Sequence, residues 1–221
     1  MTARVIAGLL LAALVCSAQA QPVAHADQAL IAAGGRGDAS EVARLLREGV
    51  SVHARDASGR TALIAATDGN HAAAARLLIA AGADVNAKDG IEDSAYLLAG
   101  ARGHVEILRL TLSSGADLTS VNRFGGTALI PAAHHGHVET VRELLKTRID
   151  IDHVNRLGWT ALLEAVILGD GGPRHLEIVR LLVGAGANVN LADRDGITPL
   201  QHARRKGQTG VAQVLATAGG G

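Results

Sequence analysis

The feature that most constrains this chain is an internal period of 33 residues. Segments starting at Asp56, Asp89, Asn122, Asn155 and Asp193 align with one another, at spacings of 33, 33, 33 and 38 residues. Five residues after each start, a Thr or Ser opens the sequences TALIAA, SAYLLA, TALIPA, TALLEA and TPLQHA. A period of this length predicts a stack of supersecondary units instead of one globular core.

The composition agrees with such a stack. The chain has 221 residues, of which 48% are hydrophobic, but it contains only one Trp, one Tyr and one Phe. Burial therefore has to come from Ala, Leu, Ile and Val, which suits closely packed helices in a repeated array. The 21 basic side chains are balanced by 21 acidic ones, which argues against a nucleic-acid binder because phosphates require a basic surface.

Each unit reads as two helices followed by a hairpin loop. The Thr or Ser of the turn is expected to cap the first helix by accepting a backbone N–H, and Pro199 follows its cap at the position where a missing N–H is harmless. A left-handed residue then ends the first helix in several copies: Asn70, Gly103, Gly136 and Gly207. Glycines also end the second helix, at Gly82, Gly115 and Gly186. The recurring Asp84, Asp117, Asp150 and Asn188 are interpreted as hairpin residues, not as acid or base catalysts.

These repeats resemble ankyrin repeats, in six copies. The resemblance covers residues 27–220 and divides them into 27–55, 56–88, 89–121, 122–154, 155–192 and 193–220. It implies an all-α repeat solenoid, a stack of six helix-turn-helix units with short hairpin loops. The His of the family's TPLH sequence is replaced here by Ile64, Leu97, Ile130, Leu163 and Gln201, so the contact that His makes in the family is expected to be absent.

The first twenty residues are predicted to be a secretory signal peptide. Arg4 is followed by an apolar run over residues 5–15 and by Ala18-Gln19-Ala20, a small-x-small cleavage sequence. Cleavage near Ala20 leaves a short segment, 21–26, and removes the one cysteine, Cys16. Alternatives are cleavage at residues 24–26, a lipoprotein signal at Cys16 and an N-terminal helix. The mature chain is expected to be periplasmic or secreted, monomeric and free of the membrane.

Two internal copies depart from the pattern. In the fourth, Arg148 occupies the slot of the helix-closing glycine, where a left-handed conformation would cost roughly 1 to 2 kcal/mol, and Pro131 interrupts the first helix. This indicates either tolerated drift or a flexible joint. The fifth copy carries five extra residues near 169–173, predicted to form a projecting loop between its helices. That loop is either a tolerated insertion or a partner contact; a phosphate cradle would require a following Gly-Lys-Ser/Thr.

The sequence contains few candidates for chemistry. No Gly-x-Ser-x-Gly sequence occurs, and we expect no catalytic residue and no cofactor. His134, His135 and His137 are close enough in sequence to suggest copper or zinc binding as an alternative function. His137, however, matches His71, His104 and His175, which are interpreted as turn residues that open the second helix.

The resemblance implies that a partner protein binds the concave face made by hairpin tips and first helices. Two of the three aromatic residues, Phe124 and Trp159, fall on adjacent tips beside Arg123 and Arg156, and these residue types dominate interface hot spots. Alternatively, both rings pack sideways and stabilise the stack. The candidate partner-binding residues are Arg123, Phe124, His134, His135, Arg156, Leu157, Trp159, Arg194, Ile197, Arg205 and Lys206.

The predicted function is therefore a non-catalytic protein–protein interaction module of the bacterial periplasm. Its partner is not identified by the sequence. Such a module could hold or protect an exported enzyme, or neutralise a toxin enzyme as an immunity-type inhibitor. The alternative from another functional class is metal binding by the three histidines.

Overall fold

The computed structural model describes residues 25–221, which consist of helices and loops without a β-strand. The prediction of an all-α repeat solenoid is confirmed. The predicted signal peptide, residues 1–20, lies outside the described residues. The chain divides into two compact units, one ending at Ala83 and one from Asp84 to Gly221, and each is described by itself.

The first unit contains two helix pairs. A helix over residues 25–36 precedes α2 (Ala39–Arg47), and α3 (Ala62–Asp68) precedes α4 (Ala72–Ala80). α3 packs on α4, and α4 packs on α2. Leu30, Leu63 and Leu78 are fully buried between these helices. The helix over 25–36 approaches α3 closely at Gly34, where a Cβ would lie 2.7 Å from the Ala62 carbonyl oxygen.

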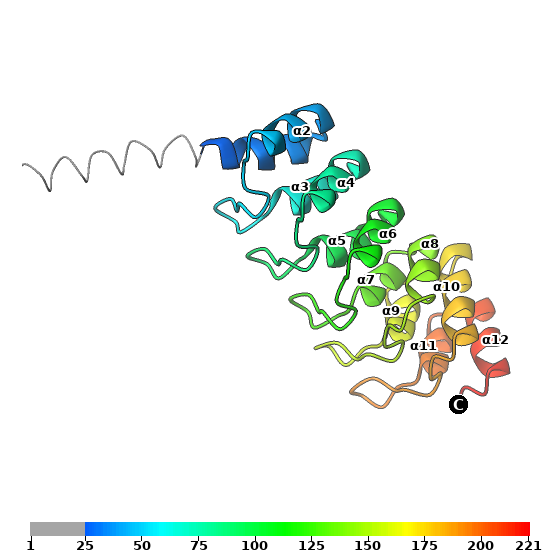
Figure 1. Ribbon diagram of the computed structural model, residues 1–221. Coiled ribbons are helices and arrows are strands. Elements are labelled where there is room, and N and C mark those ends of the chain that lie inside the picture. The colour runs from blue at the N-terminus through cyan, green and yellow to red at the C-terminus, as the bar shows by residue number, and fades with distance from the viewer. Residues whose placement is uncertain (1–24) are drawn as a thin grey trace, which may run out of the picture. The chain divides into compact units, whose positions relative to one another are not determined.

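The second unit contains four helix pairs in the same arrangement. The first helices are α5 (Ala95–Arg102), α7 (Leu129–His134), α9 (Ala161–Ile167) and α11 (Pro199–Arg205). The second helices are α6 (Val105–Ser113), α8 (Val138–Leu144), α10 (Pro173–Gly184) and α12 (Thr209–Thr217). Within this unit each first helix packs on the neighbouring first helices, and each second helix packs on the neighbouring second helices. The hairpin loops project on one side beyond the first helices (Figure 1). The helix pairs of the two units together are consistent with six repeats.

Four of the five expected N-caps of the first helices are confirmed. Thr61, Ser94, Thr160 and Thr198 each accept a hydrogen bond from the backbone N–H three residues later. Thr127 does not: α7 starts later, and the Thr127 hydroxyl is buried without a hydrogen-bond partner among the described residues. Pro131 provides the reason, because it replaces the residue whose N–H bonds to the cap carbonyl in the other copies. The N–H of Ile130 bonds to the Thr127 carbonyl instead.

The expectation that Arg148 is strained is wrong. Positive φ angles outside glycine occur, among the described residues, only at Asn70 and Glu92. α8 ends early, and the Thr147 hydroxyl donates to the Leu144 carbonyl at 2.6 Å and accepts the Ile149 N–H at 3.2 Å. A side chain thus satisfies backbone groups that the left-handed glycine turn satisfies elsewhere, so Arg148 keeps an ordinary conformation.

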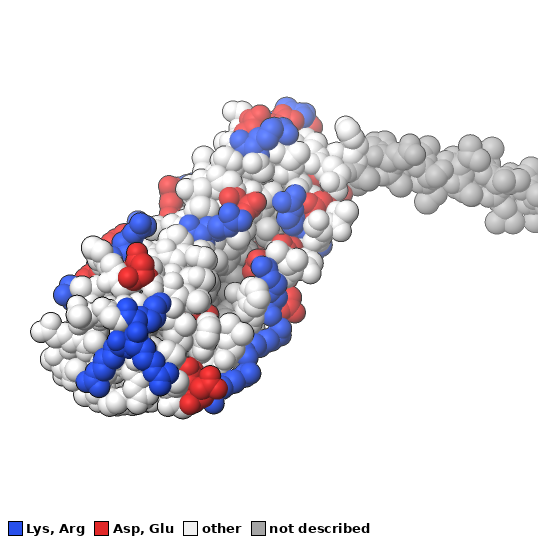
Figure 2. Space-filling model, turned by 180° about the vertical axis from the view of Figure 1, so that it is seen from behind, with Lys and Arg blue, Asp and Glu red and all other residues white. Residues whose placement is uncertain are grey.

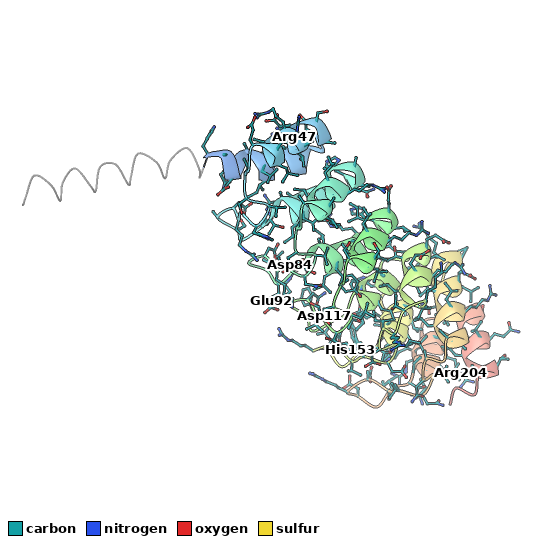
Figure 3. All side chains as sticks on the ribbon, viewed as in Figure 1. Arg47, Asp84, Glu92, Asp117, His153 and Arg204 are labelled. Atoms are coloured by element: carbon teal, nitrogen blue, oxygen red, sulfur yellow. The ribbon has the colours of Figure 1, made fainter. Side chains whose placement is uncertain are left out.

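One side-chain oxygen organises each hairpin loop. In the fifth copy, Asn155 Oδ1 accepts the N–H of Leu157 at 2.9 Å and of Trp159 at 3.0 Å, while the Asn155 N–H donates to the Trp159 carbonyl. The residues that start the other loops make the same pair of bonds: Asp56, Asp89, Asn122 and Asp193. Asp84, Asp117 and His153, which lie between the second helix of one copy and the first helix of the next, follow one another in Figure 3.

The fourth residue of each of these loops has a positive φ. It is glycine in four copies, for example Gly125 at 73° and Gly158 at 87°, but Glu92 in the third copy, at 67°. Glu92 is exposed, and Figure 3 shows it at the edge of its loop. Its side chain therefore adds strain to the loop without filling a space in the core.

We predict that Glu92→Gly raises the free energy of unfolding by about 1 kcal/mol, because glycine adopts a positive φ without the Cβ clash. Urea unfolding measures the change. Asp195→Gly is the control, since Asp195 is an exposed carboxylate on a hairpin tip with ordinary φ, and glycine there should lower stability. Equal losses in both variants would contradict the assignment of strain to Glu92.

Candidate partner-binding groove

A hollow of about 430 Å³ lies between the hairpin loops and the first helices of residues 91–168. We call it the hairpin groove. Its apolar lining includes Ile91, Leu98, Phe124, Ile130, Leu157 and Leu168, and its polar lining includes Asp93, Arg102, Arg123, His134, His135, Asn155 and Glu164. Five of the eleven candidate residues thus line one hollow: Arg123, Phe124, His134, His135 and Leu157.

Exposed apolar side chains gather at this groove. Among the described residues, the large hydrophobic side chains left exposed are Ile91, Phe124, Val154, Leu157 and Leu168, and all but Val154 line the groove. Phe124 and Leu157 are 53% and 50% exposed. A clustered apolar surface rimmed by polar residues is typical of an interaction site, whereas single exposed hydrophobic residues are ordinary.

Arg123 connects this apolar surface to an acidic neighbour. Its guanidinium carbon lies 4.7 Å from the centre of the Phe124 ring, and its Nη1 lies 3.5 Å from Asp93 Oδ2. Burial raises the pKa of Asp93 while the charge of Arg123 opposes that shift. The Phe124 ring is therefore held by a cation on the rim and leaves about half of its surface to solvent.

The other predicted arginines on the hairpin tips hold the loops together. Arg156 Nη1 donates to the Arg123 carbonyl at 2.6 Å, and Arg194 Nη2 donates to the Arg156 carbonyl at 2.5 Å. Each arginine thus bridges to the preceding tip, one repeat back. We conclude that Arg156 and Arg194 have a structural role whether or not they also contact a partner.

The remaining candidate residues lie outside the groove lining. Trp159 and Ile197 are half-buried, and Arg205 is exposed at the end of α11. Lys206 Nζ donates to the carbonyls of Ile167 at 2.5 Å and Gly169 at 3.0 Å, where a cation complements the C-terminal end of α9. Of the two aromatic candidates, Phe124 therefore lies on the groove and Trp159 does not.

The sequence prediction missed a buried carboxyl group in the groove. The Glu164 side chain is 8% exposed, its Oε1 accepts the Asn155 Nδ2–H at 2.8 Å, and its Oε2 lies 3.5 Å from His134 Nδ1. Burial raises the pKa of Glu164 to about 7, against the opposing effect of the Asn155 hydrogen bond. Burial, assisted by the charges of His135 and His175, lowers the pKa of His134.

Repeat alignment contains the signal that would have revealed Glu164. The equivalent residues in the other copies are Ala65, Leu98, Pro131 and His202, so Glu164 is the one acidic residue at this position. His202 Nε2 bonds to Asp193 Oδ2 at 2.7 Å, where Glu164 bonds to Asn155. Both polar residues thus bond to the residue that starts their own hairpin loop.

Three of the four recurring histidines, His71, His137 and His175, contact the backbone of the preceding copy. His71 Nε2 lies 3.1 Å from the Gly35 carbonyl oxygen, His137 bonds to the Ala101 backbone, and His175 Nε2 lies 2.8 Å from the His134 carbonyl oxygen. Gln208 replaces histidine in the last copy and donates to the carbonyls of Val166 and Gly169 at 3.1 Å. These contacts support the structural interpretation of His137.

The three histidines proposed for metal binding do not converge on one point. The rings of His134 and His135 are stacked with centroids 4.2 Å apart, and that of His135 lies 5.8 Å from that of His137. Across residues 25–221, no group of three or more His, Cys, Asp or Glu side chains is arranged to hold a metal ion. The metal-binding alternative therefore has no ligand set in this part of the chain.

The insertion in the fifth copy is ordered by side-chain contacts. Residues 168–172 form a loop between α9 and α10, as predicted for 169–172. Pro173, however, is the first residue of α10 and His175 lies inside that helix, so the predictions that Pro173 belongs to the loop and that His175 opens the helix are wrong. Proline is favoured at this first position because it lacks only an unused N–H. Asp170 Oδ1 accepts the Gly172 N–H at 2.9 Å and lies 2.8 Å from His175 Nδ1. The insertion thus lengthens both the loop between the two helices and the second helix.

Two surface properties bear on the class of partner. Figure 2 shows acidic side chains beside the groups of basic ones on the face that it displays. In the described part of the chain, no helix combines the length and the apolar character needed to cross a bilayer.

The sequence is similar to known ankyrin-repeat proteins. The family model described as "Ankyrin repeats (3 copies)" matches residues 6–89 and 96–193, and "Ankyrin repeats (many copies)" matches residues 173–216. Among curated proteins, the chain is 46% identical over 56 residues to the putative ankyrin repeat protein YahD of Escherichia coli strain K12. That match covers 25% of this chain and only 28% of YahD.

Solved structures match over most of the chain. An ankyrin repeat domain from Acinetobacter baumannii AYE is 56% identical, with a TM-score of 0.84 over 87% of this chain and 98% of that one. The ankyrin repeat protein EF0377 is 41% identical, with a TM-score of 0.83 over 86% and 97%. The ankyrin repeat domain of Bcl-3, a member of the IkappaB protein family, is 31% identical, with a TM-score of 0.78 over 87% and 86%.

The raised pKa of Glu164 predicts a pH-dependent effect of Glu164→Gln. A carboxyl whose pKa is about 7 when folded and about 4.5 when unfolded takes up a proton on folding, so wild-type stability falls as pH rises through this window. Glutamine keeps an acceptor for Asn155 and does not ionise. We expect the variant to gain about 2 to 3 kcal/mol over wild type between pH 4.5 and pH 8.

Urea unfolding at several pH values measures this difference. Glu139→Gln is the matched control, because Glu139 is an exposed carboxylate on α8. The free energy of unfolding of this variant should change with pH in parallel with that of wild type. A constant difference between Glu164→Gln and wild type across this range would show that Glu164 titrates normally.

Proposed function

Because the chain belongs to the ankyrin-repeat family, whose repeats are generally protein–protein interaction modules, we propose that it binds a partner protein through the hairpin groove. Proteins of this family are typically non-enzymatic binding modules. The observation that carries the proposal is the clustering of Ile91, Phe124, Leu157 and Leu168 around a single hollow. The groove lies between hairpin tips and first helices, the face expected from the family resemblance.

Two features make this groove suitable for a protein partner. Aromatic and arginine side chains supply hot-spot energy when a partner excludes water from them, and Phe124 with Arg123 forms such a pair. The loops that carry these residues are fixed by the bridges from Arg156 and Arg194. A partner therefore meets a surface that loses little conformational freedom on binding.

We predict that the double variant Phe124→Ala and Leu157→Ala loses partner binding by at least about tenfold while its melting temperature stays close to that of wild type. Both side chains are half exposed, so their truncation creates no core cavity. The partner is captured with the chain from residue 21 onward, identified and purified, and its affinity for each variant is then measured.

Val154→Ala provides the matched control for the double variant. Val154 is 50% exposed, like Leu157, but does not line the groove, so its loss should leave affinity unchanged. If the captured protein binds the double variant as tightly as wild type, its binding site lies elsewhere and the proposed groove function is abandoned.

We also propose that the chain acts in the bacterial periplasm after removal of its signal peptide. The support is the basic residue, apolar run and small-x-small sequence of residues 1–20. We expect the protein to appear in the periplasmic fraction with Gln21 at its N-terminus, as determined by mass spectrometry. Replacing Ala18 and Ala20 with Arg should block cleavage; recovery of unprocessed wild-type protein in the cytoplasm would contradict the export proposal.

A further inference from the structure

The hairpin groove contains the buried carboxyl group of Glu164. Glu164 lines the groove from α9, and the structure gives it one hydrogen bond, from the amide of Asn155. That amide is neutral, and the nearest group able to carry a positive charge is His134 at 3.5 Å. His134 is held toward its neutral form because burial lowers its pKa.

The basic residues of the groove are already engaged. Arg123 pairs with Asp93 and lies over the Phe124 ring, and Arg102 also has an interaction within the protein. No charge of an arginine contributes to the pKa shift of Glu164, which results from burial and from the Asn155 bond. Among the described residues, the ionised Glu164 carboxylate therefore has His134 as its one neighbour that can carry a positive charge, and His134 is held toward its neutral form.

The surroundings of Glu164 suit a long side chain with an apolar stem. Ile130, Phe124 and Leu157 line the same hollow, whose volume of about 430 Å³ is ample for one extended side chain and part of its backbone. Lysine and arginine combine an aliphatic stem with a charged end. An acidic side chain in the same place would add a second negative charge at a poorly hydrated position, which is strongly unfavourable.

We propose that the hairpin groove recognises a lysine or arginine side chain of the partner protein, whose charged end pairs with Glu164 while neighbouring apolar residues of the partner pack on Phe124 and Leu157. This inference rests on the proposed function, since it names the chemistry that the partner presents to that groove. It assigns to Glu164 a role in selecting the partner, beyond the apolar contact made by the exposed side chains.

Such recognition depends on pH with a defined sign. With a pKa of about 7, Glu164 is mostly protonated at pH 6 and mostly ionised at pH 8, and the cation binds the ionised form. Affinity should therefore rise roughly tenfold between these values. Protonation of His134 at low pH would place a competing cation 3.5 Å from Glu164 and reinforce the same trend.

The other charged or titratable groups near Glu164 are accounted for on each packed element. On α7 and across the groove these groups are His134, His135, Asp93, Arg102 and Arg123. On α10 the group is His175, which is paired with Asp170. At α11 the groups are His202, which is paired with Asp193, and Lys206, which is bonded to carbonyls at the end of α9. Those with a partner inside the protein are not available to neutralise Glu164.

A random heptapeptide library displayed on phage tests the proposal. The library is panned against the chain from residue 21 onward, and peptides are retained if they lose binding to the Phe124→Ala, Leu157→Ala variant. These peptides are then synthesised, and their affinities for wild type, Glu164→Gln and the control Glu139→Gln are measured at pH 6, 7 and 8. Circular dichroism confirms that each variant is folded.

The proposal expects the retained peptides to share a Lys or Arg at one position. Replacement of that residue by norleucine, or Glu164→Gln, should each weaken binding at least tenfold and remove the rise in affinity with pH, while Glu139→Gln changes neither.

Groove-dependent peptides without a basic residue, or with unchanged affinity for Glu164→Gln, would overturn this inference and leave the proposed function standing. Affinity that falls as pH rises would show protonated Glu164 donating to a neutral group and would also overturn it. Absence of any groove-dependent peptide would contradict both proposals.

Discussion

The hairpin loops of this protein depend on one side-chain oxygen at the start of each loop. That oxygen accepts two backbone N–H groups that would otherwise lack a partner inside the loop, and thereby fixes the position of the tip relative to the first helix. Aspartate and asparagine both supply it, which explains why both occur at this position in the repeats. Asparagine adds a donor, and in the fifth copy the Asn155 amide uses it to hold the buried carboxyl of Glu164. An aspartate at the same place would repel that carboxyl.

The groove combines a rigid frame with an apolar rim that the protein itself does not cover. Its frame consists of packed first helices and of loops bridged by Arg156 and Arg194. Its rim includes Phe124 and Leu157, which are half exposed although buried apolar residues fill the interior of the same repeats. This exposed apolar rim has an unfavourable free energy of hydration in the isolated protein. Binding of a partner removes the rim from solvent, which favours association.

The sequence predicted those parts of the structure that repeat. The 33-residue period, the Thr and Ser caps and the left-handed residues after the first helices identify the helix pairs, because each is a local backbone requirement that recurs in register. The prediction failed at Arg148, which occupies the position of the helix-closing glycine. There the Thr147 side chain makes the hydrogen bonds that the glycine turn makes elsewhere, and Arg148 is not strained. The uncapped Thr127 follows from Pro131 four residues later, because proline has no N–H to bond to the Thr127 carbonyl.

The candidate site was predictable only in part. Phe124, Leu157 and the adjacent histidines were found because aromatic residues are scarce and hairpin tips are the usual contact surface of the family. Their convergence on one hollow, and the location of Trp159 outside its lining, required the positions of side chains from three consecutive copies. Glu164 was overlooked because a single acidic residue within a first helix resembles ordinary surface variation. Only its burial and its bond to Asn155 distinguish it.

The Glu164 carboxyl lines the groove, is buried, and has its hydrogen bond from a neutral amide and, among the described residues, no lysine or arginine beside it. Carbon-13 NMR of the Glu164 side-chain carboxyl across a pH titration measures this directly, with assignment from the spectrum of Glu164→Gln. The account predicts a midpoint near pH 7. A midpoint close to 4.5, the ordinary value for glutamate, would show that Glu164 is hydrated or paired and would contradict the account.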